Sequence, residues 1–271
     1  MNIVAFGFAL LGLITSITGV VVYVAKVQKN QTPKVPIGLL FFLILGVVIG
    51  ASSVTVAISS SLLSIVVTSI PFVFSVFIGL MFIFLLLQKK APLGDIKVKV
   101  GDSVLSFEAQ TSLGTSFSAD NLKSKRTLLK FFRGSWCPYC SSELQMFDDM
   151  LPEFKAYDIQ VVALSGDTVT QANTHQLRDN LTLTLLADPE LHVIRTYGVE
   201  HHKAVSWDSE NMRTFFGVSI SMNAFQYRSM SIPTTLLVDE EGVIQWIDQS
   251  DDYRLRASRE NVMSAIKQSF T

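Results

Sequence analysis

Cysteine is scarce in this sequence of 271 residues, which contains only Cys137 and Cys140. A structural zinc site needs four ligands, usually two cysteine pairs or one pair with histidines, and no second cysteine pair exists here. The chain has four histidines, all distant from the cysteines along the sequence: His175, His192, His201 and His202. A zinc site completed by His201 and His202 is the weaker alternative. We therefore predict no metal and no cofactor.

The first ninety residues lack acidic residues, cysteine and histidine altogether. They contain five lysines, so the rest of the chain holds the other 17 basic residues and all 23 acidic residues. This acidic remainder has no basic run, which argues against nucleic-acid binding. The first ninety residues can neither relay dithiols nor ligate haem, and no ionisable group marks a transport path. We interpret residues 1–90 as a membrane anchor.

Three uncharged runs fill this anchor: Ile3 to Ala25, Ile37 to Ile58, and Leu62 to Leu87 with Pro71 as a predicted kink. A spanning helix needs about 20 apolar residues, so each run predicts one transmembrane helix. The first run has no basic leader and is too long for the apolar part of a signal peptide. Buried helices of a soluble protein are the alternative.

The lysines predict how the anchor is oriented. The first loop carries Lys26, Lys29 and Lys34, and Lys89 and Lys90 follow the third run. The second loop is uncharged. The positive-inside rule then places the large domain in the cytoplasm and the N-terminus outside. We expect a multi-pass protein of a bacterial inner membrane, and a periplasmic or extracytoplasmic domain is the alternative.

Gly46 and Gly50 form a GxxxG spacing in the second run. Such a pair lets helix backbones approach closely. We expect it to serve a tight hairpin of the second and third helices, and a dimerisation face is the alternative.

A short linker, residues 91–96, precedes a domain of residues 97–271 in which predicted strands and helices alternate. We expect strands at 98–100, 104–109, 127–132, 159–164, 183–186, 234–238 and 243–247, and helices after Cys140, over 169–180, from Asp188 to Gly198 and after Ser258. Pro152 should kink or divide the helix after Cys140. Asp188 and Pro189 predict a capped helix start. Residues 200–230 are read as an insertion near the active site, and the whole as a mixed sheet with helices on both faces.

The segment from Thr127 to Cys140 reads TLLKFFRGSWCPYC. It predicts a buried strand, a sharp turn and a helix that begins at the cysteine pair. At a helix N-terminus, backbone N–H groups and the helix dipole favour a thiolate, so we expect a lowered pKa at Cys137. Cys137 is then the nucleophile, and Cys140, one turn later, resolves the mixed disulfide.

Two neighbours of the cysteines support this redox interpretation. Pro138 suits the first helical turn, where its missing N–H costs nothing. Trp136 would pack beside the dithiol and shield it, or it is simply a core aromatic residue.

The WCPYC motif after FFRG, together with Ile-Pro-Thr-Thr before VDEEG, resembles the thioredoxin superfamily. Within residues 97–271, the stretch GDSVLSFEAQTSLGTSFSADNLKSKRTLLKFFRGSWCPYC resembles the AhpC/TSA (redoxin) group, in particular its peroxiredoxin-like branch with an RGxWCPYC motif. The resemblance implies a thioredoxin-like fold. It also implies that Pro233 is a cis-proline facing the dithiol and that the Ile232 backbone pairs with an extended substrate.

The chain departs from these families in places. Lys130 and Gly134 stand where peroxiredoxins carry Pro and Thr, and Pro233 stands where they carry a peroxide-polarising arginine. Arg133 is a candidate to supply that charge. Glu143 matches an acidic position of the membrane-tethered TlpA/ResA-type reductases, and a solvated glutamate of the first helical turn is the alternative.

Three functions follow from these observations. We favour a membrane-anchored thiol–disulfide oxidoreductase, restored by a separate thiol reductant. The second is a thiol peroxidase with Cys137 peroxidatic and Cys140 resolving. The third is a non-enzymatic tethered binding domain with a vestigial dithiol. The expected partners are a protein or small-molecule disulfide, or a peroxide, and no nucleic acid.

Overall fold

The computed structural model describes residues 2–207, 212–215, 218–221 and 225–270. The chain divides into two compact units, Met1–Lys89 and Lys90–Thr271. The first unit consists of helices alone, and the second is built around a central β-sheet.

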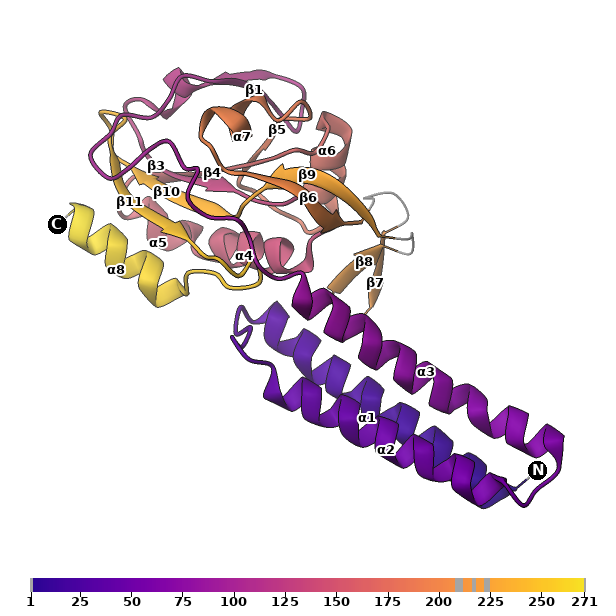
Figure 1. Ribbon diagram of the computed structural model, residues 1–271. Coiled ribbons are helices and arrows are strands. Elements are labelled where there is room, and N and C mark those ends of the chain that lie inside the picture. Colours follow the sequence, from indigo (N-terminus) through magenta and orange to yellow (C-terminus); the bar gives the residue numbers. More distant parts are fainter. Residues whose placement is uncertain (1, 208–211, 216–217, 222–224, 271) are drawn as a thin grey trace. The chain divides into compact units, whose positions relative to one another are not determined.

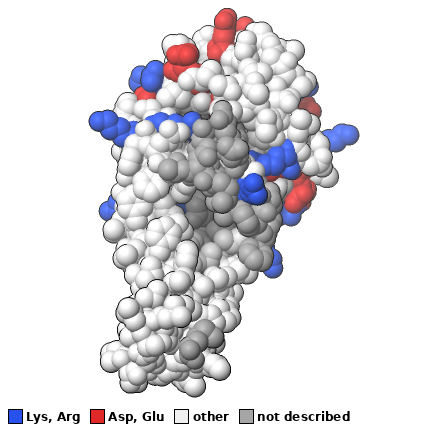
Figure 2. Space-filling model, turned by 90° about the vertical axis from the view of Figure 1, so that its right-hand side faces the viewer, with Lys and Arg blue, Asp and Glu red and all other residues white. Residues whose placement is uncertain are grey.

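The first unit consists of three helices, α1 (Ile3–Gln28), α2 (Ile37–Ala57) and α3 (Leu62–Leu87) (Figure 1). Their lengths of 26, 21 and 26 residues correspond to about 30–40 Å at about 1.5 Å per residue. All three are long and apolar enough to cross a membrane. On the face that Figure 2 shows, the surface of this unit carries almost no charged side chains.

The glycines of α2 pack mainly against α1. A Cβ atom built on Gly12 of α1 would lie 2.5 Å from the carbonyl oxygen of Gly46 and 2.8 Å from the nitrogen of Gly50. Gly50 also faces the ring of Phe72 in α3, and a Cβ atom on Gly46 would strike the Ser16 hydroxyl of α1. The expectation that this pair serves the second and third helices is therefore wrong for Gly46, because glycines on both α1 and α2 supply the close approach.

The second unit contains a seven-stranded sheet in the order β11-β10-β3-β4-β5-β1-β2. Its strands are β1 (Glu108–Thr111), β2 (Ser116–Ser118), β3 (Arg126–Phe131), β4 (Ile159–Ser165), β5 (Thr184–Ala187), β10 (Thr234–Val238) and β11 (Ile244–Gln249). Strands β3, β4 and β5 are parallel, and the remaining pairings are antiparallel. The predicted mixed sheet is confirmed.

Helices cover both faces of this sheet. They are α4 (Pro138–Asp149), α5 (Leu151–Lys155), α6 (Val169–Arg178), α7 (His192–Thr196) and α8 (Arg259–Phe270), with a 3-10 turn η1 (Ala119–Leu122). Figure 1 shows α4, α5 and α8 on one face and α7 on the other. As expected, the helix after the cysteines divides before Pro152, and the Ser258 hydroxyl caps α8 by accepting a hydrogen bond from the Asn261 N–H at 3.2 Å.

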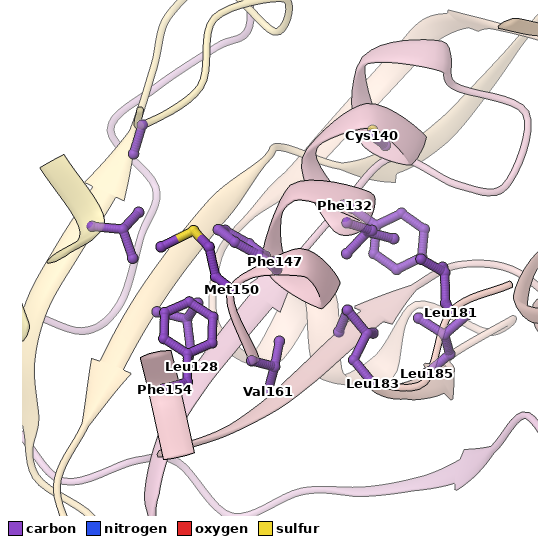
Figure 3. Packing of buried hydrophobic residues seen from close by; sticks show 14 of the residues in the cluster. Leu128, Phe132, Cys140, Phe147, Met150, Phe154, Val161, Leu181, Leu183 and Leu185 are labelled. Atoms are coloured by element: carbon purple, nitrogen blue, oxygen red, sulfur yellow. The ribbon is translucent and has the colours of Figure 1, made fainter. Parts of the chain in front are cut away.

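Alternation along the strands creates two hydrophobic layers. Leu128 of β3 packs under α4 with Phe147 and Met150 (Figure 3). Leu129, the next residue, packs on the opposite face with Val193 and Ile194 of α7. Successive strand side chains point to opposite faces, so one strand supplies both layers. Cys140 belongs to the layer beneath α4.

Three predicted elements differ from the structure. Residues 98–100 do not form a strand; the first strand begins at Glu108. The helix predicted from Asp188 begins only at His192. The Asp188 carboxylate lies before the helix and accepts hydrogen bonds from the N–H groups of His192 (2.8 Å) and Ile194 (2.9 Å) in its first turn. The irregular segment 200–230 contains four strands, β6 (Glu200–Ser206), β7 (Met212–Phe215), β8 (Val218–Ser221) and β9 (Gln226–Ser231), paired β6 with β9 and β7 with β8.

Gly198 ends α7 as predicted. Its φ is +67°, and the Val199 N–H donates to the Ile194 carbonyl at 3.0 Å, as in a Schellman motif. A Cβ atom at this position would collide with the backbone carbonyl of Asp95. Gly101, with φ +92°, also needs a left-handed backbone but has open space around its missing side chain.

This pair predicts a difference in stability. Gly101→Ala should cost about 1 kcal/mol through backbone strain alone, whereas Gly198→Ala should cost about 2 kcal/mol more because the Asp95 backbone must also move. Urea unfolding of the full chain in detergent measures this, since all three tryptophans, Trp136, Trp207 and Trp246, report on the second unit. Equal losses for the two variants would contradict the collision.

Candidate active site

The cysteines lie where strand β3 gives way to helix α4. Cys137 is the N-cap of α4, and its carbonyl accepts hydrogen bonds from the N–H groups of Cys140 and Ser141, both at 3.0 Å. Pro138 occupies the first turn, as predicted. The dithiol is thus held at the start of a helix by local sequence.

The loop before the cysteines is held by Asp167, which follows the end of β4. The Asp167 carboxylate accepts a hydrogen bond from the Ser135 N–H at 2.7 Å. Gly134 has φ +148°, and a Cβ atom there would lie 2.6 Å from the indole nitrogen of Trp136. A threonine at position 134, as peroxiredoxins have in the resemblance above, does not fit this loop.

The two sulfur atoms form a buried pair. Cys140 Sγ lies 2.8 Å from Cys137 Sγ, within hydrogen-bonding distance. Cys137 is 1% exposed and Cys140 is 0% exposed. Trp136, 2% exposed, belongs to the same hydrophobic cluster, which fits both its shielding role and its role as a core residue.

A buried group of charges adjoins Cys140. Glu143 Oε1 lies 2.7 Å from Lys130 Nζ, and Glu143 Oε2 lies 2.6 Å from Arg256 Nε. The Arg256 Nη2 atom donates to Cys140 Sγ at 3.5 Å. The side chains of Lys130 and Glu143 are 1% and 0% exposed. The alternative that Glu143 is solvated is wrong, because this position of α4 faces the sheet and meets Lys130.

These charges explain which thiol ionises. Lys130 and Arg256 bring two positive charges, and among the described residues Glu143 is the carboxylate that pairs with both, with Asp248 of β11 close enough to interact with them as well. Burial alone would raise the pKa of Cys140, but the hydrogen bond from Cys137 and the charge of Arg256 lower it to about 6. Burial and the hydrogen bond with Cys140 raise the pKa of Cys137 well above its ordinary value.

The expected lowering of the pKa at Cys137 is therefore wrong in this structure. Its sulfur makes no capping hydrogen bond to α4, so the helix N-terminus does not offset the cost of burial. The nearest guanidinium lies against Cys140 instead. The two thiols titrate as a pair: the first proton is lost at a lower pH than from an ordinary thiol, and the second at a higher pH.

Arg133 lies next to the dithiol on the other side. Its side chain is 3% exposed, and its Nη2 donates to the carbonyl oxygen of Val205 at 2.6 Å. The guanidinium stacks 3.8 Å from the ring centroid of Tyr253 and 5.0 Å from that of Trp136. Among the described residues no carboxylate pairs with Arg133, so it contributes positive charge near Cys137.

Strands β6 and β9 pack against this region. The ring of Trp207, just after β6, lies 5.9 Å from that of Trp136, and Arg228 of β9 lies 5.7 Å from the Trp136 ring. Met230 of β9 accepts a hydrogen bond from Arg133 Nε through its sulfur at 3.1 Å. These contacts place parts of the 200–230 segment beside the dithiol, as the sequence interpretation expected.

Ile232 and Pro233 do not match what the resemblance implied. No cis peptide bond occurs among the described residues, so the bond before Pro233 is trans. The Ile232 N–H donates to the Val199 carbonyl at 2.7 Å, and the Ile232 carbonyl accepts from the Thr234 hydroxyl at 3.1 Å. The backbone is used inside the domain, because β9 runs directly into this turn, and the expected pairing with a substrate is wrong.

The histidines lie apart from the sulfur pair. Buried His175 is 3.0 Å from the Ser141 hydroxyl and 3.0 Å from the Asp179 carboxylate, and His201 and His202 lie on β6. In the part of the chain that the structure describes, no three His, Cys, Asp or Glu residues come together in a way that could hold a metal ion.

Sequence reasoning missed the role of two residues. Lys130 carried a signal, since it is the only charged residue within the apolar run TLLKFF and must bury its ammonium group with a partner. Arg256 carried none, because the loop after β11 has no motif and meets α4 only in the folded domain.

A cavity of about 560 Å³ lies elsewhere, beside Arg126 and Phe270.

The second unit of this chain is similar in sequence to known thiol-dependent enzymes. The profile of the AhpC/TSA family matches residues 100–247, more than half of the chain. A protein of Coxiella burnetii, called putative peroxiredoxin bcp, is 29% identical over 150 residues, which cover 55% of this chain and 87% of that protein. The thiol-disulfide oxidoreductase ResA of Bacillus anthracis is 26% identical over 104 residues, 38% of this chain and 60% of ResA.

Among solved structures, the thiol peroxidase from Chromobacterium violaceum matches with a TM-score of 0.50 at 10% identity. The match covers 66% of this chain and 91% of the peroxidase. At this identity the likeness shows the fold alone, the thioredoxin-like fold that the sequence predicted.

The buried ion group predicts a large loss of stability for Glu143→Gln. Removing the shared carboxylate leaves Lys130 and Arg256 buried without their counter-charge, which should cost about 3–5 kcal/mol. Glu108→Gln, an exposed glutamate of β1, is the matched control and should change stability by less than about 0.5 kcal/mol. Urea unfolding followed by tryptophan fluorescence measures both, and a Glu143→Gln domain as stable as the parent would refute the pairing.

Proposed function

The chain belongs to the AhpC/TSA family, and from this premise we propose that it is a membrane-anchored thiol–disulfide oxidoreductase that works through Cys137 and Cys140. The observation that carries the proposal is the buried sulfur pair at the start of α4, with one thiol in contact with a buried guanidinium. A structural role would need neither two free thiols within reach of each other nor a cation next to one of them.

In the proposed reaction the dithiol reduces a substrate disulfide. The Cys140 thiolate takes the proton of Cys137, and the Cys137 thiolate attacks one sulfur of the substrate, releasing the other as a thiolate. Cys140 then gives up its proton and attacks Cys137 Sγ in the mixed disulfide, which frees the second substrate thiol. The dithiol loses two electrons and two protons, and a separate thiol reductant restores it.

A thiol peroxidase is the second candidate, supported by the family and by the likeness to the putative peroxiredoxin bcp. In this reaction the Cys137 thiolate attacks a peroxide oxygen and becomes a sulfenic acid, an alcohol or water leaves, and Cys140 condenses with the sulfenic acid to give the disulfide and water. Buried Arg133 is the cation available beside Cys137. Against this candidate, Gly134 and Lys130 replace the threonine and proline that the resemblance leads us to expect.

The two candidates differ in what oxidises the reduced protein quickly. We expect the full chain in detergent to reduce insulin disulfides with a thiol reductant present and to react with hydrogen peroxide only slowly in stopped-flow fluorescence. Cys137→Ser should abolish turnover, and Cys140→Ser should trap a mixed disulfide on Cys137. Rapid second-order oxidation by peroxide, with weak insulin reduction, would replace this proposal with the peroxidase.

We propose further that α1, α2 and α3 cross the membrane and hold the domain on its cytoplasmic side. The three helices are long enough to span, and the five lysines of the first ninety residues flank their predicted cytoplasmic ends. A domain on the other face is the alternative, and it would suit work on exported proteins, whose thiols meet an oxidising environment.

The side of the membrane can be tested with an added exposed thiol, because the native thiols are buried. Leu113, 78% exposed in the turn between β1 and β2, is a suitable site. In a Cys137→Ser, Cys140→Ser chain, Leu113→Cys should resist an impermeant maleimide in intact cells and react after the membrane is opened. Labelling in intact cells would reverse the orientation.

A further inference from the structure

Arg256 is fixed against the dithiol by contacts from three directions. Its side chain is 4% exposed and comes from the loop between β11 and α8. Nε faces Glu143 at 2.6 Å, Nη2 faces Cys140 Sγ at 3.5 Å, and Nη1 donates to the carbonyl oxygens of Tyr253 and Leu255. A guanidinium held in this way has no freedom to leave the sulfur.

Glu143 does not neutralise this guanidinium fully. Its other oxygen is taken by Lys130 at 2.7 Å, and Lys130 also donates to the Thr235 hydroxyl at 3.0 Å. Asp248 of β11 also faces the group, and burial raises the pKa of its carboxyl. Lys130 and Arg256 therefore share the carboxylate of Glu143, with Asp248 nearby, and the Nη2 atom of Arg256 is left to contact one sulfur, Cys140 Sγ.

We propose that Arg256 is a catalytic residue of the reductive half-reaction, where it stabilises Cys140 as the leaving thiolate. This inference rests on the proposed thiol–disulfide exchange. An external thiolate attacks Cys137 Sγ of the Cys137–Cys140 disulfide, a new sulfur–sulfur bond forms, and the old one breaks. The electron pair goes to Cys140 Sγ, beside the guanidinium. A second external thiolate then attacks the external sulfur of the mixed disulfide and frees Cys137, which takes up a proton.

The same contact determines which sulfur is attacked. In thiol–disulfide exchange the sulfur whose thiolate is more stable leaves faster. Arg256 touches Cys140, so the external thiol becomes attached to Cys137. The contact of Arg256 with Cys140 thus gives the two sulfurs of the disulfide different roles, and the mixed disulfide forms at the helix N-cap.

The test compares reduction of the oxidised full chain, in detergent, by dithiothreitol and by 2-mercaptoethanol. Arg256→Gln should slow reduction about tenfold, because the pKa of Cys140, lowered to about 6 in the parent, should rise when the charge of Arg256 is removed and the thiolate becomes a poorer leaving group. Arg259→Gln, an arginine at the start of α8 with an exposed side chain, is the matched control and should leave the rate unchanged. With 2-mercaptoethanol, mass spectrometry should find the adduct on Cys137 in the parent and on both cysteines in Arg256→Gln.

A second variant decides the matter if Arg256→Gln does not fold. Arg256→Lys keeps the charge but moves it, so the pH at which the ultraviolet absorbance of the thiolate appears and the rate of reduction should shift together. A rate that stays at the parent value while the Cys140 titration moves, or an unchanged rate in folded Arg256→Gln, would overturn the role of Arg256. A parent chain that exchanges with no disulfide would instead refute the proposed function itself.

Discussion

A buried guanidinium in contact with a buried sulfur pair governs the chemistry of this domain. Two cations, Lys130 and Arg256, share the carboxylate of Glu143 in the buried interior. Charges in such surroundings interact strongly and must be balanced nearby. A thiolate at Cys140 contributes to that balance, so the same arrangement that keeps the ion group tolerable in the interior also prepares the dithiol to ionise.

The two cysteines consequently have different environments although they are three residues apart. Cys137 caps a helix beside Arg133, Trp136 and Tyr253, whereas Cys140 lies against Arg256 inside the core. The asymmetry gives one sulfur the position at the helix end and the other the stabilised charge. Division of labour between a sulfur that exchanges with partners and a sulfur that leaves as a thiolate follows from this difference.

Local sequence patterns predicted much of this molecule. The apolar runs predict α1, α2 and α3, the run before RGSW predicts β3, and Gly198 marks a helix end with a left-handed backbone. The segment 200–230 escaped prediction as strands because its pairing partners lie up to about thirty residues apart. The expected strand at 98–100 failed because Val98 packs into the hydrophobic layer near α7 while Val100 is exposed, and the segment does not join the sheet.

The sequence by itself determined that a dithiol follows a buried strand and begins a helix, because those features depend on neighbours within a few residues. Only the tertiary structure decided which thiol carries the lowered pKa. That outcome depends on Lys130 from β3, Glu143 from α4 and Arg256 from a loop more than a hundred residues later. Burial makes their charges interact, and burial is a property of the folded chain rather than of any short segment.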